Sequence, residues 1–96
     1  MKEYFVYIMT SDQGELYIGI TSNLLGRTQA HQRGEGSLYT REHHINKLIY
    51  AETYDNPLQA IAREKQLKKW SRKKKIILIE RMNPSWRDLY EDMINF

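Results

Sequence analysis

The sequence contains no cysteine and no apolar run approaching the roughly 18 residues that a membrane-spanning helix needs. The missing thiols exclude a disulfide framework and a zinc–thiolate site. The first nine residues, MKEYFVYIM, lack the long apolar stretch and small-residue cleavage site of a signal peptide. We therefore expect a cytoplasmic protein that is not inserted in a membrane. No repeat or low-complexity linker divides the chain, so one domain is predicted over residues 1–96.

Positive charge is concentrated in one segment of the chain. Residues 63–75, REKQLKKWSRKKK, carry eight basic residues and one acidic residue, although the net charge of the whole chain is only +3. Such a segment attracts polyanions, of which nucleic acid is the first candidate and an anionic membrane surface the second. The hydrophobic content of 41% and charged content of 28% are typical of a globular protein.

The order of apolar and turn-forming stretches predicts an α+β fold with the elements β-β-α-β-α-α-α. Turn residues 11–15 separate two strand-like runs, so these runs are expected to form a hairpin. The predicted strands are residues 4–10, 16–21 and 46–54. The predicted helices are residues 22–36, 55–70, 71–82 and 83–94, with a continuous or kinked connection near Ser71. Residues 37–44 are predicted to be a loop.

A glycine interrupts the second predicted strand, LYIGIT, where it costs backbone entropy and adds no packing. Alternation along the strand puts Tyr17 and Gly19 on the same face. If the hairpin pairs residues whose numbers sum to 24, Tyr7 lies opposite Tyr17 and points to the same side. Gly19 then leaves a hollow beside two phenols. The alternative interpretation is an ordinary aromatic pair at the edge of the core.

Two basic side chains fall on one face of the first predicted helix. Arg27 and His31 are four residues apart and project near Leu24, on the side expected to face the sheet. They are either an arginine that extends to solvent beside an edge histidine, or an electropositive pair over the tyrosines. In the second case the planar guanidinium suits phosphate oxygens.

An acidic residue lies inside the apolar arc of the second predicted helix. Glu64 falls between Ile61 and Leu67 at the helical period. A carboxylate in that position must be paired, hydrogen-bonded or bound to a cation. It is either a ligand for a hard divalent ion such as Mg²⁺ or a member of an ion pair. The candidate partners for an ion pair are Arg27, Arg63 and Lys68.

Taken in order, these residues resemble the motifs of the GIY-YIG nuclease domain. The second motif is complete as YIG at residues 17–19, and the first is degenerate, with FVY or VYI within residues 5–8. Arg27 and His31 fit the Arg-x-x-x-His helix of the family. The segment AREKQLKKWSRKKKIILI, followed by NPSW, is similar to the small stand-alone bacterial branch, the YhbQ-like proteins.

The resemblance implies a small three-stranded antiparallel β-sheet flanked by helices, and cleavage of phosphodiester bonds in DNA during repair or processing. It implies that Glu64 holds one Mg²⁺ or Mn²⁺ ion, which polarises the scissile phosphate. Tyr7 is the first choice for taking or relaying the proton of the attacking water, with Tyr17 in support. Arg27 is expected to stabilise charge on the phosphoryl oxygens, and His31 to orient a tyrosine or a water.

Three supporting positions follow from the same resemblance. Gly19 keeps the strand beside the site uncluttered, and Tyr39 fills the place where the family often has a further histidine or tyrosine. Asn83 matches a family position, but its alternative role is to cap a helix before Pro84, as Asn56 is expected to do before Pro57.

The expected partner is DNA, although the residues do not distinguish DNA from RNA. The predicted nucleic-acid contacts are Arg27, Lys68, Lys69, Arg72, Lys73, Lys74 and Lys75. These cations contact phosphates and provide no base readout, so a protein partner is expected to supply substrate specificity. The alternative function is a catalytically weak or inactive nucleic-acid-binding or adaptor module. Trp70 and Trp86 are interpreted as packing residues.

Overall fold

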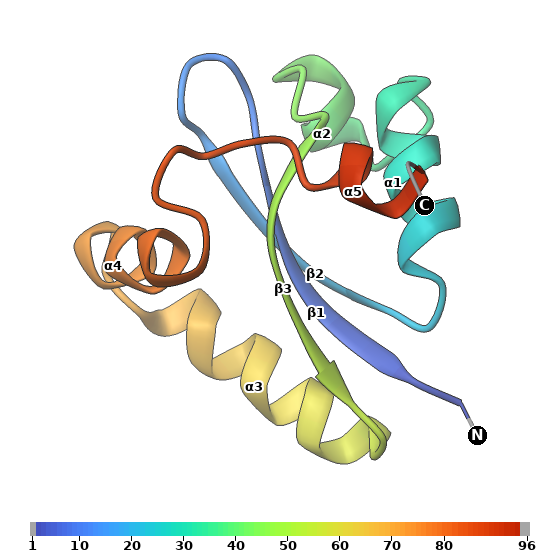
Figure 1. Ribbon diagram of the computed structural model, residues 1–96, viewed down its shortest axis with the longest axis vertical. Helices are drawn as coiled ribbons and strands as arrows, with labels where there is room; N and C mark the ends of the chain where they lie inside the picture. Colours follow the sequence, from blue (N-terminus) through green and yellow to red (C-terminus); the bar gives the residue numbers. More distant parts are fainter. Residues whose placement is uncertain (1, 95–96) are drawn as a thin grey trace.

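A three-stranded antiparallel sheet in the order β2-β1-β3 forms the centre of the computed structural model, which describes residues 2–94 (Figure 1). The predicted α+β class and the three-stranded sheet are confirmed. The predicted domain range of 1–96 includes Met1, Asn95 and Phe96, which lie outside the described residues. The strands are β1 (Tyr4–Thr10), β2 (Leu16–Thr21) and β3 (Lys47–Tyr54).

Helices cover both faces of the sheet. One face carries α1 (Leu24–Gln32), α2 (Leu38–Glu42) and α5 (Tyr90–Ile94), and the other carries α3 (Pro57–Lys69) and α4 (Arg72–Met82) (Figure 1). None of these described helices is both long enough and apolar enough to cross a membrane.

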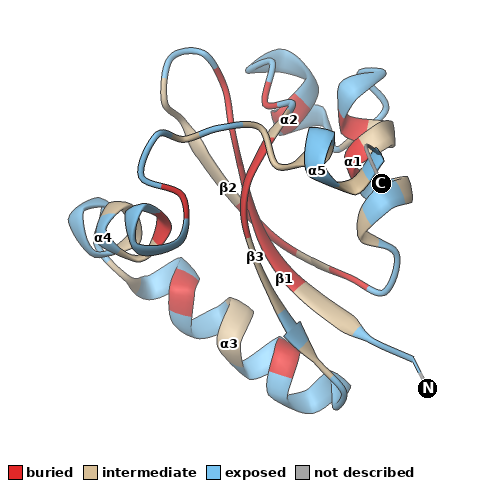
Figure 2. Ribbon diagram, in the orientation of Figure 1, coloured by how far each residue is buried: buried red, intermediate tan, exposed pale blue. Residues whose placement is uncertain are grey.

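Each face of the sheet has its own apolar cluster, and most of β1 is buried between them (Figure 2). This follows from the central position of β1, whose alternate side chains point to opposite faces. The cluster under α3 and α4 includes Val6, Ile8, Ile18, Ala60, Leu67 and Ile79. The cluster under α1 and α5 includes Tyr7, Met9, Ile45 and Leu48, with Leu24 and Met93 at its border.

The register of the β1–β2 hairpin differs from the predicted one by one pair. Tyr7 lies opposite Gly19, and Met9 lies opposite Tyr17, so the paired numbers sum to 26. The turn chemistry sets this register: Gly14 has a positive φ of 84° and donates its N–H to Ser11 O at 3.0 Å. Because the sum is still even, Tyr7 and Tyr17 share a face, as the sequence predicts.

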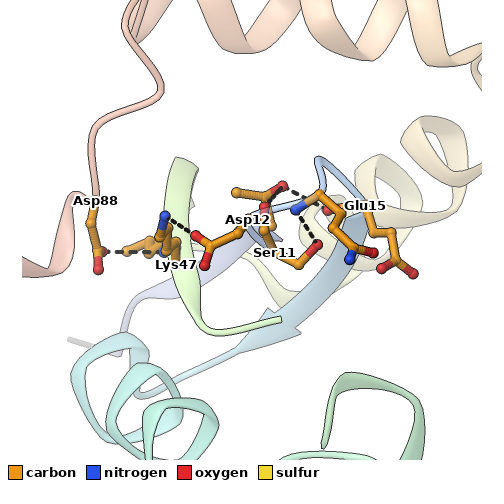
Figure 3. Close-up of polar contacts among 8 residues, drawn as sticks. Ser11, Asp12, Glu15, Lys47 and Asp88 are labelled. Atoms are coloured by element: carbon orange, nitrogen blue, oxygen red, sulfur yellow. Dashed lines mark hydrogen bonds and ion pairs between the residues drawn. The ribbon is translucent and has the colours of Figure 1, made fainter. Parts of the chain in front are cut away.

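The turn of the β1–β2 hairpin and the segment before α5 are both tied to the start of β3 (Figure 3). Lys47 at the start of β3 forms an ion pair with Asp12 in the hairpin turn. The next residue, Leu48, donates its backbone N–H to Asp88 Oδ1 at 3.3 Å. These contacts hold three segments that are far apart in the sequence at one end of the sheet.

The segment predicted to be a loop, residues 37–44, contains a short helix instead. Ser37 is the N-cap of α2 and its Oγ accepts a hydrogen bond from Thr40 N at 3.3 Å. The preceding helix α1 is shorter than the predicted range of 22–36, because it ends at Gln32 before Gly34, whose φ is +73°. The observed order therefore has one more helix than predicted.

Helices α3 and α4 are separate, which resolves the connection near Ser71. Trp70 leaves the helical conformation, and Ser71 Oγ then accepts a hydrogen bond from Lys74 N at 3.2 Å as the N-cap of α4. The predicted start of α3 is confirmed, since Asn56 Oδ1 accepts from Leu58 N at 2.8 Å. Capping residues thus define both helices.

Asn83 does not cap a following helix, because α5 begins only at Tyr90. It ends α4, is 4% exposed, and joins three backbone groups. Its Nδ2 donates to Ile49 O at 3.1 Å and to Arg87 O at 2.8 Å, while its Oδ1 accepts from Arg87 N at 3.0 Å. The N-cap interpretation of Asn83 was wrong, since this side chain attaches the segment after α4 to β3.

Replacing Asn83 with alanine is expected to lower the free energy of unfolding by about 2–3 kcal/mol, since buried carbonyl groups lose their partner. The matched control is Asn56→Ala, which removes an exposed N-cap hydrogen bond and should cost about 1 kcal/mol. Urea denaturation of both variants measures the difference. Equal losses would show that Asn83 contributes no more than an exposed cap.

Candidate active site

The ring of Tyr7 lies across the backbone of the edge strand β2 at Gly19. A Cβ added to Gly19 would lie 2.4 Å from both Cζ and Oη of Tyr7, far inside van der Waals contact. Gly19 is therefore required by the close approach of this ring. The space beside the glycine, interpreted from the sequence as a hollow, is filled by Tyr7 itself.

Tyr7, Tyr17 and His31 form an aromatic cluster at this edge of the sheet. The ring centroids are 6.4 Å apart for Tyr7 and Tyr17, 6.2 Å for Tyr7 and His31, and 5.6 Å for Tyr17 and His31. The two strands and α1 thus bring together three of the residues that the sequence predicts for the site.

The two tyrosines of this cluster differ in their access to solvent. Tyr7 is 1% exposed, and its buried Oη has no hydrogen-bond partner among the described residues. Burial, together with the neighbouring Tyr17, raises the pKa of Tyr7 to about 12, against the lowering effect of Arg27. Tyr17 is half-buried and lines a cavity. The structure therefore favours Tyr17 over Tyr7 as the phenol that meets a substrate or an attacking water.

A cavity of about 180 Å³ opens beside the cluster. Arg27 is exposed at this cavity and forms no ion pair with another described residue. Its guanidinium is therefore available to an anion such as a phosphate group. The acidic residue at the cavity, Glu35, is instead paired with Arg33 at 3.0 Å. The cavity is lined by Tyr17, Arg27, Ala30, His31, Glu35, Gly36 and Ser37.

His31 provides a neutral ring at this cavity. It is 5% exposed, and its buried Nδ1 has no partner within the described part of the chain. Burial, followed by the positive charge of Arg27, lowers the pKa of His31 below its ordinary value of 6.5. The predicted electropositive pair is thus reduced to one cation, Arg27, beside an uncharged imidazole at neutral pH.

Replacing Arg27 with alanine is expected to raise the pKa of His31, because one of the two causes that depress it is removed. The His31 pKa should still stay below 6.5, since burial is the larger cause. A folded-state pKa below the unfolded value means that stability falls as the pH drops from about 6.5 toward the folded value, and Arg27→Ala reduces this fall. Histidine titration by NMR measures the shift. Arg33→Ala is the control, and equal shifts in both variants would contradict the assignment.

Glu64 lies on the sheet-facing side of α3, between the fully buried Ala60 and Leu67. Its side chain is 16% exposed, and its Oε2 is 3.4 Å from Lys68 Nζ. Of the ion-pair partners considered from the sequence, Lys68 is the one observed. The predicted apolar arc was misplaced, because Ile61 is 39% exposed and the buried arc is centred on Ala60 and Leu67.

The Glu64 carboxylate lies close enough to the cluster for its charge to raise the pKa of Tyr7, as a smaller cause than burial. Helix α3 packs across β1 and β2, which places Glu64 under the strands that carry the tyrosines. Within residues 2–94, no three histidine or acidic side chains gather as a metal site. Glu64 is therefore a single carboxylate ligand candidate.

Two predicted supporting residues lie outside the aromatic cluster. Tyr39 stacks on His43, with ring centroids 4.2 Å apart, and its Oη donates to Glu15 Oε2 at 3.5 Å. Asn83 bonds to the backbone of β3. The structure thus gives both residues local partners, and their roles at the site remain predictions.

The predicted nucleic-acid contacts differ in their partners within the protein. Lys68 pairs with Glu64, and Arg72 Nη2 donates to Gly14 O at 2.8 Å. Lys74 Nζ lies 5.3 Å from the ring centroid of Trp70. Three other predicted contacts, Lys69, Lys73 and Lys75, form no ion pair with the described residues.

A carboxylate network at the opposite edge of the sheet was missed from the sequence. Arg63 Nε and Nη2 each donate to one oxygen of Glu52 at 2.9 Å, which is a bidentate ion pair. Both Tyr50 and Tyr54 also donate their hydroxyls to Glu52. The Tyr-x-Glu-x-Tyr alternation puts these three side chains on one face of β3 and is the signal that indicates them. The network holds α3 beside β3 through Arg63, the residue that precedes Glu64.

The sequence matches a known protein family over most of its length. Residues 3–76 match the family described as the GIY-YIG catalytic domain. The UPF0213 protein of Staphylococcus aureus strain Mu3 is 36% identical over 80 residues, which cover 83% of this chain and 98% of that protein. The corresponding UPF0213 protein of strain USA300 matches with the same identity and coverage.

A solved structure is similar over almost the whole chain. The solution NMR structure of the UPF0213 protein BH0048 from Bacillus halodurans has a TM-score of 0.59 and 25% identity, and the match covers 97% of both chains. The names of these relatives state no activity.

Proposed function

Because this chain belongs to the GIY-YIG family of catalytic domains, we propose that it is a divalent-metal-dependent endonuclease that hydrolyses phosphodiester bonds in DNA. The observation that carries the proposal is the meeting of Tyr17, Arg27 and His31 at one cavity, with Tyr7 packed behind them. A phosphate group in this cavity would meet a cation and a phenol together. Its biological setting is proposed to be DNA repair or processing.

Each side chain at the cavity has a chemical task in this proposal. The exposed guanidinium of Arg27 binds the phosphoryl oxygens and stabilises the charge that develops on them. Tyr17 Oη hydrogen-bonds the attacking water and accepts its proton. A free phenol has a pKa near 10, so this step needs neighbouring positive charge to favour phenolate. His31, neutral and buried, fixes the orientation of the Tyr17 ring.

The donor set fits an ion that is bound mainly by water and substrate oxygens. No three histidine or acidic side chains of the described residues gather at the site, so Glu64 would be a lone protein carboxylate ligand, and Mg²⁺ is often held by one or two carboxylates together with waters and phosphate. Glu64 would hold Mg²⁺ or Mn²⁺, and the bound ion would polarise the scissile phosphate and stabilise the leaving oxygen. Lys68 already neutralises this carboxylate and must release it when the ion binds.

The ion pair between Glu64 and Lys68 also supports a second candidate function. A carboxylate that keeps its lysine partner binds no metal, and the domain then acts as a nucleic-acid-binding or adaptor module. This candidate predicts salt-sensitive DNA binding without cleavage.

A cleavage assay on single-stranded, duplex, flap and branched DNA, with Mg²⁺, Mn²⁺ or EDTA, separates the two functions. The nuclease predicts strand breaks that require the metal and disappear with EDTA. Salt-sensitive binding to these substrates, with no metal-dependent break in any of them, would reject the nuclease and favour the adaptor.

A further inference from the structure

A second candidate surface lies where the end of α3 meets α4. It is a groove of about 310 Å³ lined by Trp70, Lys74, Ile77, Leu78 and Arg81. We propose that this groove binds an unpaired nucleotide of a DNA strand, with the base against the apolar wall and the flanking phosphates on Lys74 and Arg81. The inference rests on the proposed function, because it names the substrate class as duplex DNA that carries a single-stranded segment.

The chemistry of the groove is complementary to a nucleotide. Its wall is apolar, its two charged residues are both basic, and no carboxylate lines it. Lys74 and Arg81 are exposed and form no ion pair inside the described range 2–94. Ile77 is 47% exposed, so the wall itself is accessible. Single-stranded nucleic acid is bound by such combinations of aromatic or apolar surface with cations that track the backbone.

Two cations lie over the Trp70 ring: Arg63, which is anchored by an ion pair, and Lys74, which is not. The Arg63 guanidinium lies 5.0 Å from the ring centroid and is fixed by its bidentate bond to Glu52. Lys74 lies 5.3 Å from the same centroid and has no such anchor. An entering base therefore meets a rigid indole, and the Lys74 ammonium can transfer from the ring to a phosphate.

Exposed lysines of α3 lie between Glu64, the candidate metal ligand, and the groove. Trp70, the C-cap of α3, follows Glu64 by six residues, which corresponds to about 9 Å along the helix axis and, by way of the solvent side, about 240° around it. On the solvent side of α3, the surface between these two residues carries Lys65, Lys68 and Lys69, all exposed. A strand that leaves the site can thus follow lysines to the groove.

Fluorescence anisotropy with labelled DNA tests the proposal in EDTA, on a Glu64→Ala background that prevents cleavage. The probes are a blunt duplex, the same duplex with a short single-stranded tail, and the same duplex with a tail of abasic sites. We expect the base-bearing tail to increase affinity about tenfold over the blunt duplex, and the abasic tail to lose most of this gain.

The variants distinguish nucleotide binding in the groove from general electrostatic attraction to DNA. Arg81→Ala and Lys74→Ala, both at exposed positions, should reduce the preference for the base-bearing tail, and Trp70→Leu should abolish it. Lys73→Ala is the matched control, since it removes the same charge from α4 outside the groove. It should weaken binding of all three probes equally.

Equal affinity for base-bearing and abasic tails would overturn the proposal, as would equal effects of Lys73→Ala and Lys74→Ala. Binding of a peptide of alternating glutamate and leucine that is lost in Arg81→Ala, without any tail preference, would assign the groove to an acidic protein segment instead. If the wild-type protein prefers the base-bearing tail but cleaves no DNA, the nuclease function is rejected and nucleotide binding in the groove is retained. If it cleaves DNA without preferring the tail, the nuclease function is retained and nucleotide binding in the groove is rejected.

Discussion

Replacing Glu64 with alanine is expected to lower the metal-dependent cleavage rate by about three orders of magnitude, because the proposed ligand of the ion is removed. The fold should be retained. Glu64 makes one ion pair, with Lys68 one turn further along the helix, and such pairs contribute about 0.3–0.5 kcal/mol. Single-turnover cleavage with Mn²⁺, together with thermal unfolding, measures both effects.

Lys68→Gln is the matched control for this variant, since it breaks the same ion pair and leaves the carboxylate in place. It should keep metal-dependent cleavage, with weaker DNA binding, and bind Mn²⁺ at least as tightly as the wild type, because no ammonium competes for Glu64. If Lys68→Gln and Glu64→Ala lost cleavage to the same extent, the ion pair itself would be the required feature and the metal role of Glu64 would be rejected.

Replacing Gly19 with alanine is expected to destabilise the protein by about 1–3 kcal/mol and to lower cleavage at temperatures where the variant is folded. The new methyl group would lie 2.4 Å from Tyr7 Cζ and Oη, so the ring must move. Tyr7 is 1% exposed inside the cluster with Tyr17 and His31, so its displacement also disturbs the residues at the cavity. Urea denaturation and cleavage assays measure the two effects.

A double-mutant cycle with Tyr7→Ala isolates the cause of this loss. If the steric conflict with the ring is the cause, Gly19→Ala should cost little in a chain that already carries Tyr7→Ala. A full and additive loss in the double variant would show that the glycine is needed for its backbone, independently of Tyr7.

The strands and the grouping of the site could be predicted because they depend on local patterns. The ranges 4–10 and 16–21 match β1 and β2, since alternating apolar residues and a turn define them. Side-chain alternation placed Tyr7 and Tyr17 on one face even though the register was wrong by one pair. The four-residue spacing of Arg27 and His31 placed both at one cavity.

What could not be predicted depends on tertiary contacts. The role of Asn83 is set by carbonyl groups of β3 and of Arg87, which the Asn-Pro pattern does not indicate. The burial of Tyr7, which moves the proposed proton acceptor to Tyr17, follows from packing under α1. Trp70 packs against the core as interpreted from the sequence, but its place at a groove as well depends on the break between α3 and α4.

The bidentate bond between Arg63 and Glu52 has a consequence for how firmly α3 is held against the sheet. Arg63 and Glu64 are neighbours on α3, yet the first is anchored at the β3 edge and the second is a largely buried carboxylate on the helix that packs across β1 and β2. Because the two residues are adjacent in one helix, the bidentate bond to Glu52 also restricts rotation of the turn of α3 that carries the proposed metal ligand.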